Sequence, residues 1–324
     1  MAKSSILFVT SSRIGDAVLS SGLIRRLSEE TPDARFTIAA GPVAAPLFRD
    51  VPGLERLIVV EKRPGAGHWL ELWRATRGRR WALVVDLRGS KLSAFLRARR
   101  RAVFGPSTSG REPTHKVVQA ARLLGIEGKP PAPFLYTNAA TEAAAAALVG
   151  EGGPVLAIGP GANWRGKAWP AERFAALVGA LTAAGALFAQ GRVLLLGDAA
   201  DRPLAEVVGR AVAPERVIDL TGRVDLLTAY AALKRARLFV GADSGLMHLA
   251  AAAGVATLGL FGPSDERLYG PWGAKTRTVR GPRDFAAFKA ADPGLNQPVC
   301  HMLDLEVAAV LQAATALYEE TADG

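Results

Sequence analysis

Short apolar runs, many of them rich in β-branched residues, alternate along the chain with longer segments in which apolar residues recur at helical spacing. This alternation is typical of parallel β-sheets whose strands are joined by crossover helices. In the first half, strands are predicted at 5–10, 35–40, 56–60, 81–87 and 102–104, and the clearest helices at 16–30, 69–76 and 114–124. The pattern therefore predicts an α/β domain built on one doubly wound sheet.

A passage rich in proline and glycine, residues 125–133, interrupts this rhythm, and the pattern then starts again. In the second half, strands are predicted at 154–158, 192–196, 216–219, 238–241 and 256–261, and helices at 171–184, 203–212, 226–235 and 246–253. A last helix, at about 303–318, follows the second sheet and is placed to pack back across the domain junction. We therefore expect two doubly wound α/β domains, at 1–150 and 151–324, that face a cleft lined by the carboxyl ends of both sets of strands.

The composition excludes several broad classes of protein. Of the 324 residues, 49% are hydrophobic and 22% are charged, which is too apolar for a disordered chain. The single cysteine, Cys300, excludes an internal disulfide, and four histidines with one thiol cannot form a cysteine-rich zinc site. The sequence contains neither a signal-peptide core nor an apolar run of about 20 residues. We therefore expect a cytoplasmic protein.

Positive charge is concentrated in the first half of the chain. The net charge is +10, yet residues 1–150 hold 23 Lys and Arg against 12 Asp and Glu, whereas the remainder holds 17 against 18. Residues 62–101 contain twelve basic residues and only two acidic ones, Glu71 and Asp86. Two interpretations stay open: a solvated arginine-rich surface, or a surface that binds a polyanion such as nucleic acid, an anionic membrane or a phosphorylated substrate.

The loop after the first predicted strand carries a candidate catalytic carboxylate. It reads Ser-Ser-Arg-Ile-Gly-Asp over residues 11–16 and leads directly into a helix. An aspartate at a helix start most often serves as a cap, because it accepts hydrogen bonds from free N–H groups. Asp16, however, follows the carboxyl end of a strand, where it would face the expected cleft. There it could accept a proton from a substrate hydroxyl.

Two segments of the second half have features of an anion-binding site. Gly159 and Gly161 allow close approach of the backbone to a ligand, and Lys167 could reach an anionic group, although a solvated loop lysine has the same sequence context. The strongest local signal is Asp-Ser-Gly-Leu-Met-His at 243–248, at the turn from a strand into a helix, where free N–H groups form a ready phosphate site. A lone histidine is more often a packing residue, but His248 would face this turn.

Five motifs, in this order, resemble glycosyltransferase family 9, the ADP-heptose:lipopolysaccharide heptosyltransferases, over nearly the whole chain. They are Arg-Ile-Gly-Asp at 13–16, Lys-Ala-Trp-Pro at 167–170, Asp-Ser-Gly-Leu-Met-His at 243–248, Phe-Gly-Pro-Ser at 261–264 and Cys-His-Met-Leu-Asp at 300–304. The resemblance implies the GT-B fold, an α/β architecture of two Rossmann-like doubly wound domains facing a central cleft. The N-terminal domain would bind the acceptor and the C-terminal domain the nucleotide sugar. The reaction implied is an inverting transfer of heptose from an ADP-sugar to the inner core of lipopolysaccharide, without a metal or another cofactor.

The resemblance also implies roles for individual residues. Asp16 corresponds to the family's proposed catalytic base and lies with Arg13 and Gly15 on the acceptor side. Lys167 corresponds to the lysine at the diphosphate, where it would serve both catalysis and donor binding. The other donor-binding positions implied are Gly159, Gly161, Asp201, Asp243, Ser244, Gly245 and His248.

These expectations imply that the basic first half binds a phosphorylated glycolipid. The protein would then be peripheral at the anionic cytoplasmic face of the inner membrane. Another GT-B transferase or an epimerase, using a different nucleotide sugar, stays open. A nucleic-acid-binding protein is a remote alternative, because no such motif is present and Trp69, Trp73, Trp81 and Phe95 are expected in the core. The heptose position, the acceptor and the oligomeric state are left open.

Overall fold

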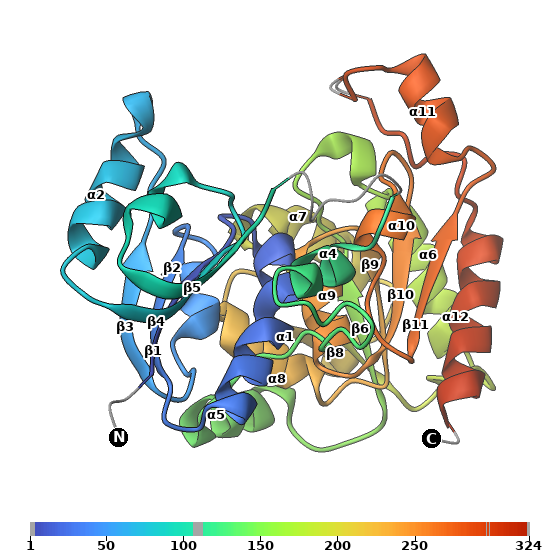
Figure 1. Ribbon diagram of the computed structural model, residues 1–324. Coiled ribbons are helices and arrows are strands. Elements are labelled where there is room, and N and C mark those ends of the chain that lie inside the picture. The colour runs from blue at the N-terminus through green and yellow to red at the C-terminus, as the bar shows by residue number, and fades with distance from the viewer. Residues whose placement is uncertain (1–3, 106–112, 296, 298, 323–324) are drawn as a thin grey trace. The chain divides into compact units, whose positions relative to one another are not determined.

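The computed structural model describes residues 4–105, 113–295, 297 and 299–322, and Figure 1 shows their fold. Contacts divide the chain into two units, Met1–Asn138 and Ala139–Gly324. Each unit is built on a parallel sheet with helices in the crossovers between strands. The α/β architecture with two parallel sheets, predicted from the alternating pattern, is confirmed.

The sheet of the first unit has the strand order β3-β2-β1-β4-β5. Its strands are β1 (Ser5–Val9), β2 (Arg35–Ala40), β3 (Leu54–Val59), β4 (Trp81–Asp86) and β5 (Ala98–Val103). The helices are α1 (Ile14–Glu30), α2 (Gly67–Thr76) and α4 (Lys116–Arg122), with the short 3-10 turns η1 (Ala45–Phe48), η2 (Pro64–Ala66) and η3 (Lys91–Phe95). The chain continues from β1 to β2 on one side and resumes with β4 on the other, so the topological switch point lies between β1 and β4.

The strand β5 is longer than the sequence pattern predicts. The expected strand covered 102–104, but β5 begins at Ala98. The arginines at 99–101 are exposed on this edge strand, where charged side chains oppose pairing with a further strand. The Arg101 guanidinium also donates a 2.9 Å hydrogen bond to the carbonyl of Ser93, which ties the edge to the preceding loop.

The sheet of the second unit has the strand order β11-β10-β9-β6-β7-β8. Its strands are β6 (Val155–Gly159), β7 (Arg192–Leu195), β8 (Val217–Asp219), β9 (Leu238–Ala242), β10 (Ala256–Phe261) and β11 (Thr276–Arg280). The helices are α5 (Ala139–Val149), α6 (Ala171–Thr182), α7 (Arg202–Gly209), α8 (Leu226–Leu233), α9 (Gly245–Ala252), α10 (Glu266–Tyr269), α11 (Phe285–Ala291) and α12 (Val307–Ala322), with 3-10 turns η4 (Arg165–Lys167), η5 (Ala199–Asp201) and η6 (Pro214–Arg216). The switch point lies between β6 and β9.

The strand β11 was not predicted, because its sequence Thr-Arg-Thr-Val-Arg is polar and it is not fully buried.

Two helices near the ends of the second unit define its extent. α5 packs on α8, and Lys234 donates a 2.6 Å hydrogen bond to Glu142. The division between units therefore falls after Asn138, before α5, whereas the sequence suggested a boundary at 150. α12 begins at Val307 and packs on α6, β10 and β11 of its own unit, as Figure 1 shows at the red end of the chain.

The central strands are buried on both faces, as expected for parallel strands covered by crossover helices. All residues of β1, β6, β9 and β10 are buried. In the second unit, side chains of these strands pack with Phe174 of α6 and Val310 of α12 in one core. Packing on both faces holds the strands in place, and it therefore also positions the loops at their carboxyl ends. Those loops carry the candidate functional residues.

Candidate active site

In the first unit, Asp16 lies in the first turn of α1, directly after the loop that leaves β1. The N-cap residue of this helix is Arg13, which makes no capping hydrogen bond with its side chain. Within the described part of the chain, the hydrogen bond to the Asp16 carboxylate comes from Ser11, whose Oγ donates to Oδ2 at 3.4 Å. Ser11 Oγ in turn accepts a 3.2 Å hydrogen bond from the Arg13 N–H. The helix therefore does not use Asp16 as a cap, and the half-buried carboxylate is available to a ligand.

The loop around Asp16 is held close to the end of β2. A Cβ at Gly41 would overlap Ser12, so the glycine allows this approach. Arg13 is exposed and makes no ion pair within the described residues, and Gly15 is half-buried in the first turn of α1. The three residues predicted on the acceptor side thus share one turn at the carboxyl edge of the first sheet.

In the second unit, Lys167, Asp243 and His248 form a charged cluster at the carboxyl edge of the sheet. Lys167 Nζ lies 2.5 Å from Asp243 Oδ2, and His248 Nε2 lies 3.8 Å from Asp243 Oδ1. The Lys167 side chain is 24% exposed, whereas those of Asp243 and His248 are 7% and 3% exposed. The structure thus brings together three residues that the sequence assigned to donor binding. The ion pair with Asp243 holds the ammonium group of Lys167 at a position that solvent reaches.

Two serine hydroxyls at the same edge have no hydrogen-bond partner among the described residues. Ser244 precedes α9 without making a capping hydrogen bond, and its Oγ is buried. Ser264, in the turn after β10, also has a buried Oγ, and the sequence analysis gave it no role of its own. Buried polar atoms without partners are uncommon, and they mark places that a ligand or water fills. With Gly245 opening α9, free N–H groups of that helix are available beside the Ser244 hydroxyl.

Gly159 and Gly161 are glycines for different structural reasons. A Cβ at Gly159 would lie 2.9 Å from the Phe239 ring, so packing inside the sheet already accounts for that residue. A Cβ at Gly161 would instead overlap the carboxylate of Asp201. Gly161 therefore lets the loop after β6 lie directly against Asp201, which follows the neighbouring strand β7.

Asp201 is held in place by a capping box with Asp198. The N–H of Asp198 donates to Asp201 Oδ2 at 3.0 Å, and the N–H of Ala200 donates to Asp198 Oδ1 at 2.8 Å. Burial raises the pKa of Asp201 above its ordinary value, and the hydrogen bond from Asp198 opposes this shift. Asp201 makes no ion pair within the described residues, so its carboxylate is a hydrogen-bond acceptor without a fixed cation.

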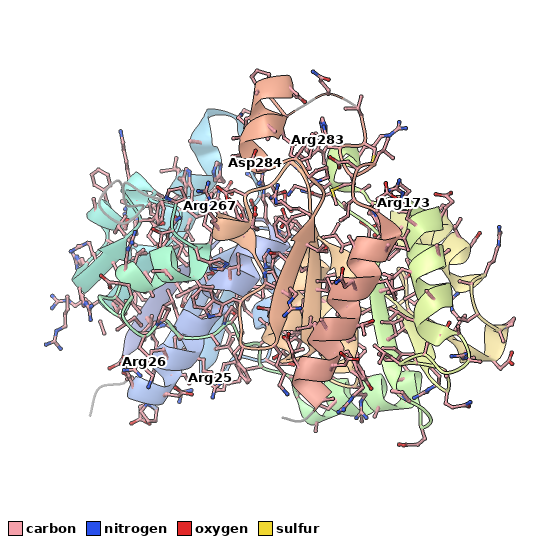
Figure 2. The ribbon with its side chains drawn as sticks, turned by 90° about the vertical axis from the view of Figure 1, so that its right-hand side faces the viewer. Arg25, Arg26, Arg173, Arg267, Arg283 and Asp284 are labelled. Atoms are coloured by element: carbon pink, nitrogen blue, oxygen red, sulfur yellow. The ribbon has the colours of Figure 1, made fainter. Side chains whose placement is uncertain are left out.

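The turn after β10 is tied down by two arginines. Arg280, the last residue of β11, donates to the carbonyl oxygens of Gly262 at 3.3 Å and of Ser264 at 2.9 Å. Arg267, which Figure 2 labels, donates two hydrogen bonds to Asp265 at 2.9 and 2.8 Å. These hydrogen bonds lower the pKa of Asp265. The Ser264 hydroxyl therefore lies in a turn whose backbone is fixed.

The segment before α12 supports the loop that carries Lys167. The N–H of His301 donates to the carbonyl of Gly166 at 3.1 Å, and Trp169 Nε1 donates to the carbonyl of Leu305 at 2.9 Å. The sequence placed this segment in a family motif but did not predict these contacts, because they join positions more than a hundred residues apart. Lys167 is thus positioned from both sides, by η4 and by the C-terminal segment.

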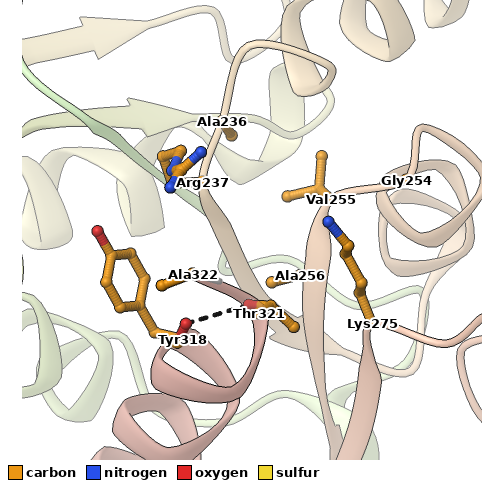
Figure 3. Close-up of a pocket in the computed structure, with 9 residues that line it drawn as sticks. All are labelled: Ala236, Arg237, Gly254, Val255, Ala256, Lys275, Tyr318, Thr321 and Ala322. Carbon is orange, nitrogen blue, oxygen red and sulfur yellow. Dashed lines mark hydrogen bonds between the residues drawn. The ribbon is translucent and has the colours of Figure 1, made fainter. Parts of the chain in front are cut away.

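A small cavity of about 100 Å³ lies at the opposite edge of the second sheet (Figure 3). Arg237 and Val255, just before β9 and β10, and Tyr318 of α12 contribute to its walls. Ligands of open α/β sheets bind at the carboxyl ends of the strands, so this cavity is not the donor site that the sequence predicts.

The described part of the chain contains neither a cluster of metal ligands nor a membrane-spanning helix. No three or more His, Cys, Asp or Glu side chains in this part of the chain are grouped so that they could hold a metal ion. None of the helices described has the length and apolar character that crossing a membrane requires.

Comparison with known proteins gives a family and relatives in sequence. A model of glycosyltransferase family 9 (heptosyltransferase) matches residues 69–293. The chain is 27% identical over 312 residues to lipooligosaccharide heptosyltransferase 2 of Haemophilus influenzae, covering 85% of this chain and 88% of the relative. It is also 27% identical over 301 residues to lipopolysaccharide heptosyltransferase 1 of Pseudomonas aeruginosa, covering 83% and 81%.

Solved structures match nearly the whole chain. A family 9 glycosyltransferase from Veillonella parvula has a TM-score of 0.80 and 19% identity, with 99% of both chains covered. The E. coli ADP-heptose heptosyltransferase II has a TM-score of 0.74 and 22% identity, with 98% and 99% covered. An E. coli heptosyltransferase with ADP has a TM-score of 0.70 and 19% identity, with 97% and 99% covered. These likenesses confirm the predicted GT-B fold.

Proposed function

This chain belongs to glycosyltransferase family 9, and we propose that it transfers a heptose from ADP-heptose to the inner core of lipopolysaccharide, with inversion at the anomeric carbon and without a metal ion. The observation that carries the proposal is the arrangement at the carboxyl edge of the second sheet. There the Lys167–Asp243 ion pair lies beside the start of α9 and the buried Ser244 hydroxyl, which has no hydrogen-bond partner within the described residues. Relatives named as heptosyltransferases support the choice of sugar and acceptor.

In this proposal the second unit binds the donor. The diphosphate of ADP-heptose lies at the N-terminus of α9, where it accepts hydrogen bonds from main-chain N–H groups and from Ser244. Lys167 contacts a phosphate oxygen while Asp243 keeps the ammonium group in place. Asp201 accepts a hydrogen bond from the nucleoside. The neighbouring structure that contains ADP supports a nucleoside diphosphate as the ligand.

The first unit binds the acceptor and supplies the base. Asp16 takes the proton of an acceptor hydroxyl as that oxygen forms a bond to the anomeric carbon of the heptose. The bond between this carbon and the diphosphate oxygen breaks on the opposite face, so the configuration inverts and ADP leaves. Negative charge develops on the departing diphosphate, and Lys167 and the α9 N–H groups stabilise it. These groups supply the positive charge that a metal ion supplies in other transferases.

The acceptor in this proposal is a phosphorylated glycolipid, which fits the excess of positive charge in residues 1–150. The protein would then work as a peripheral protein at the cytoplasmic face of the inner membrane, where anionic lipids attract basic surfaces.

The test is incubation of the protein with ADP-heptose and a set of truncated core acceptors, analysed by mass spectrometry. The expected product carries one added heptose, its anomeric configuration by NMR is opposite to that of the donor, and excess EDTA leaves the rate unchanged. Thermal shift with ADP, UDP, GDP and CMP should select ADP. Product formation with another nucleotide sugar only would replace ADP-heptose as the donor.

A further inference from the structure

An apolar groove in the first unit takes no part in the transfer chemistry proposed above. It has a volume of about 680 Å³ and lies between α2 and the segment that follows β4. Its walls include Trp69, Leu70 and Trp73 of α2 and Phe95 at the end of η3. Small-molecule sites commonly have volumes of about 300–1,000 Å³, so the groove is large enough for a ligand.

The prediction that the aromatic residues of the basic segment lie in the core is confirmed for Trp81 and wrong for Phe95. Trp81 is buried, at 2% exposed, but Phe95 is 73% exposed. Trp69 and Trp73 pack against the core of this unit but are only half-buried, and Leu70 beside them is 46% exposed. Contiguous apolar surface in contact with water is unfavourable, and it commonly marks a site that another apolar surface covers.

Basic residues without carboxylate partners line the same groove. Arg88 and Lys91 belong to its wall, and within the residues that the structure describes neither forms an ion pair. The Arg88 guanidinium lies over the Trp69 ring, with its carbon 5.0 Å from the ring centroid. Nearby Arg63, by contrast, is paired with Glu71. Two uncompensated positive charges beside apolar walls favour an amphiphile with an anionic head group over a purely apolar ligand.

The wall that carries these charges is fixed by Asp86, the last residue of β4, which is fully buried. Its carboxylate accepts hydrogen bonds from the N–H groups of Arg88 and Ser90, both at 3.0 Å. It also accepts from the hydroxyls of Ser90 and Ser93, at 2.6 and 2.9 Å. Charge-assisted hydrogen bonds of this kind are strong, so the loop is held in one conformation and the groove is preformed.

The groove also lies at the functional edge of the sheet. The loop with Arg88 leaves β4, and the loop with Asp16 leaves the neighbouring strand β1, whose last residue Val9 pairs with Asp86. Both loops therefore flank the topological switch point, where ligands of open α/β sheets bind. A molecule in the groove would have its polar end on the same edge as the proposed base.

We propose that this groove binds an acyl chain of an anionic lipid in a membrane, with Arg88 and Lys91 contacting the phosphate of the lipid head group. The inference rests on the proposed function, since a glycolipid acceptor is presented in a bilayer. Trp69, Trp73 and Leu70 supply the apolar contact for the chain, and the two cations select an anionic surface over a zwitterionic one.

Vesicle binding of the full chain tests the proposal. The protein is sedimented with vesicles of phosphatidylcholine alone and of phosphatidylcholine mixed with phosphatidylglycerol. We expect binding to the anionic vesicles that weakens as salt is added. Leu70→Gln combined with Phe95→Ser should lower this binding by about tenfold or more, because apolar side chains lose their contact with the lipid. Lys91→Gln should lower it by about fivefold.

Two matched variants serve as controls. Leu303→Gln changes an exposed leucine of the second unit, and Arg99→Gln changes an exposed arginine of β5, and neither residue lines the groove. Both should bind anionic vesicles as the unmodified protein does. The proposal is overturned if the groove variants also bind normally, if the controls lose as much, or if the groove variants lose binding to an oligonucleotide but not to vesicles.

A second measurement separates this inference from the proposed function. Transfer is assayed with a soluble acceptor that lacks acyl chains and with the acylated acceptor in anionic vesicles. The Leu70→Gln and Phe95→Ser double variant should keep the normal rate on the soluble acceptor and lose rate on the vesicles. An equal loss on both acceptors would overturn the lipid assignment. If the unmodified protein makes no heptosyl product, the proposed function fails, and the vesicle-binding result decides the groove independently.

Discussion

Lys167 Nζ lies 2.5 Å from Asp243 Oδ2, although the two residues are 76 positions apart and belong to different loops of the second sheet. The loops leave β6 and β9, the strands that flank the switch point of this sheet. Asp243 is almost fully buried, so its charge depends on Lys167 for compensation. Because the lysine remains partly exposed, the same ammonium group can neutralise Asp243 and contact a phosphate.

Replacing Lys167 should therefore affect both stability and nucleotide binding. Lys167→Met removes the lysine that pairs with the buried Asp243 carboxylate and leaves, among the described residues, only His248 near it, at 3.8 Å, so we expect a loss of up to about 3 kcal/mol in the free energy of unfolding. The affinity for ADP should fall by about tenfold or more, because a charge-assisted hydrogen bond to phosphate is lost. Denaturant unfolding and calorimetric titration with ADP measure the two effects separately.

A double variant distinguishes the two roles. Lys167→Met combined with Asp243→Asn removes both charges, so the free energy of unfolding should recover most of the loss. The affinity for ADP should stay low, since the cation is still absent. Recovery of ADP binding in the double variant would show that Lys167 does not contact the diphosphate.

Asp16→Asn tests the proposed base. The change is nearly isosteric, and Asp16 makes no capping hydrogen bond, so the fold and the affinity for ADP should be preserved. Without a group that can take the acceptor proton, transfer should fall by about two orders of magnitude or more. Ser11→Ala, which removes the 3.4 Å hydrogen bond to the carboxylate, is the matched control and should change the rate by only a few-fold. Near-normal turnover of Asp16→Asn would remove Asp16 from this role.

Much of the fold could be predicted because the central strands are buried on both faces and therefore form unbroken apolar runs. Parallel β6 and β9 are examples in which every residue is buried. The predictions were less accurate at the edges of the sheets, where burial no longer dictates the sequence. β5 carries consecutive exposed arginines and β11 is polar, so neither has the apolar pattern of an internal strand.

The part of the candidate site that lies within one short segment of the sequence could be predicted. The turn at 243–248 combines an aspartate, a small residue and a helix start, and these features can be read from one short segment. The contact of Lys167 with Asp243 and the support of Gly166 by His301 depend on tertiary packing between distant segments. No periodicity or local propensity encodes such contacts.

Asp201→Asn should raise the Tm of the protein and lower its affinity for ADP. Burial raises the pKa of Asp201 above its ordinary value of 3.8, so the folded state favours the protonated carboxyl. The favourable contribution of Asp201 is present below that ordinary value and is lost as the pH rises through the raised pKa. The asparagine variant avoids this loss, and its Tm near neutral pH should exceed that of the unmodified protein by about 1–3 °C.

Two measurements check this prediction. The difference in Tm between the variant and the unmodified protein should shrink as the pH falls toward the ordinary pKa of an aspartate, because both side chains are then neutral. The affinity for ADP at neutral pH should fall by about tenfold, because a charged acceptor for the nucleoside is lost. A variant that binds ADP normally would remove Asp201 from the donor site.

Gly161→Ala tests whether close packing of the loop after β6 against Asp201 is needed for donor binding. The added Cβ would overlap the Asp201 carboxylate, which must then leave its hydrogen bond to the N–H of Asp198. We expect a loss of about 1 kcal/mol in the free energy of unfolding, the usual cost of losing a helix cap, together with weaker ADP binding. Gly179→Ala, on α6, makes the same chemical change where nothing lies within 4 Å of the new Cβ. A glycine inside a helix is less favourable than an alanine, so this control should stabilise the protein by up to about 1 kcal/mol and leave ADP binding unchanged. If both alanine variants bind ADP equally well, the position of Asp201 does not matter to the donor.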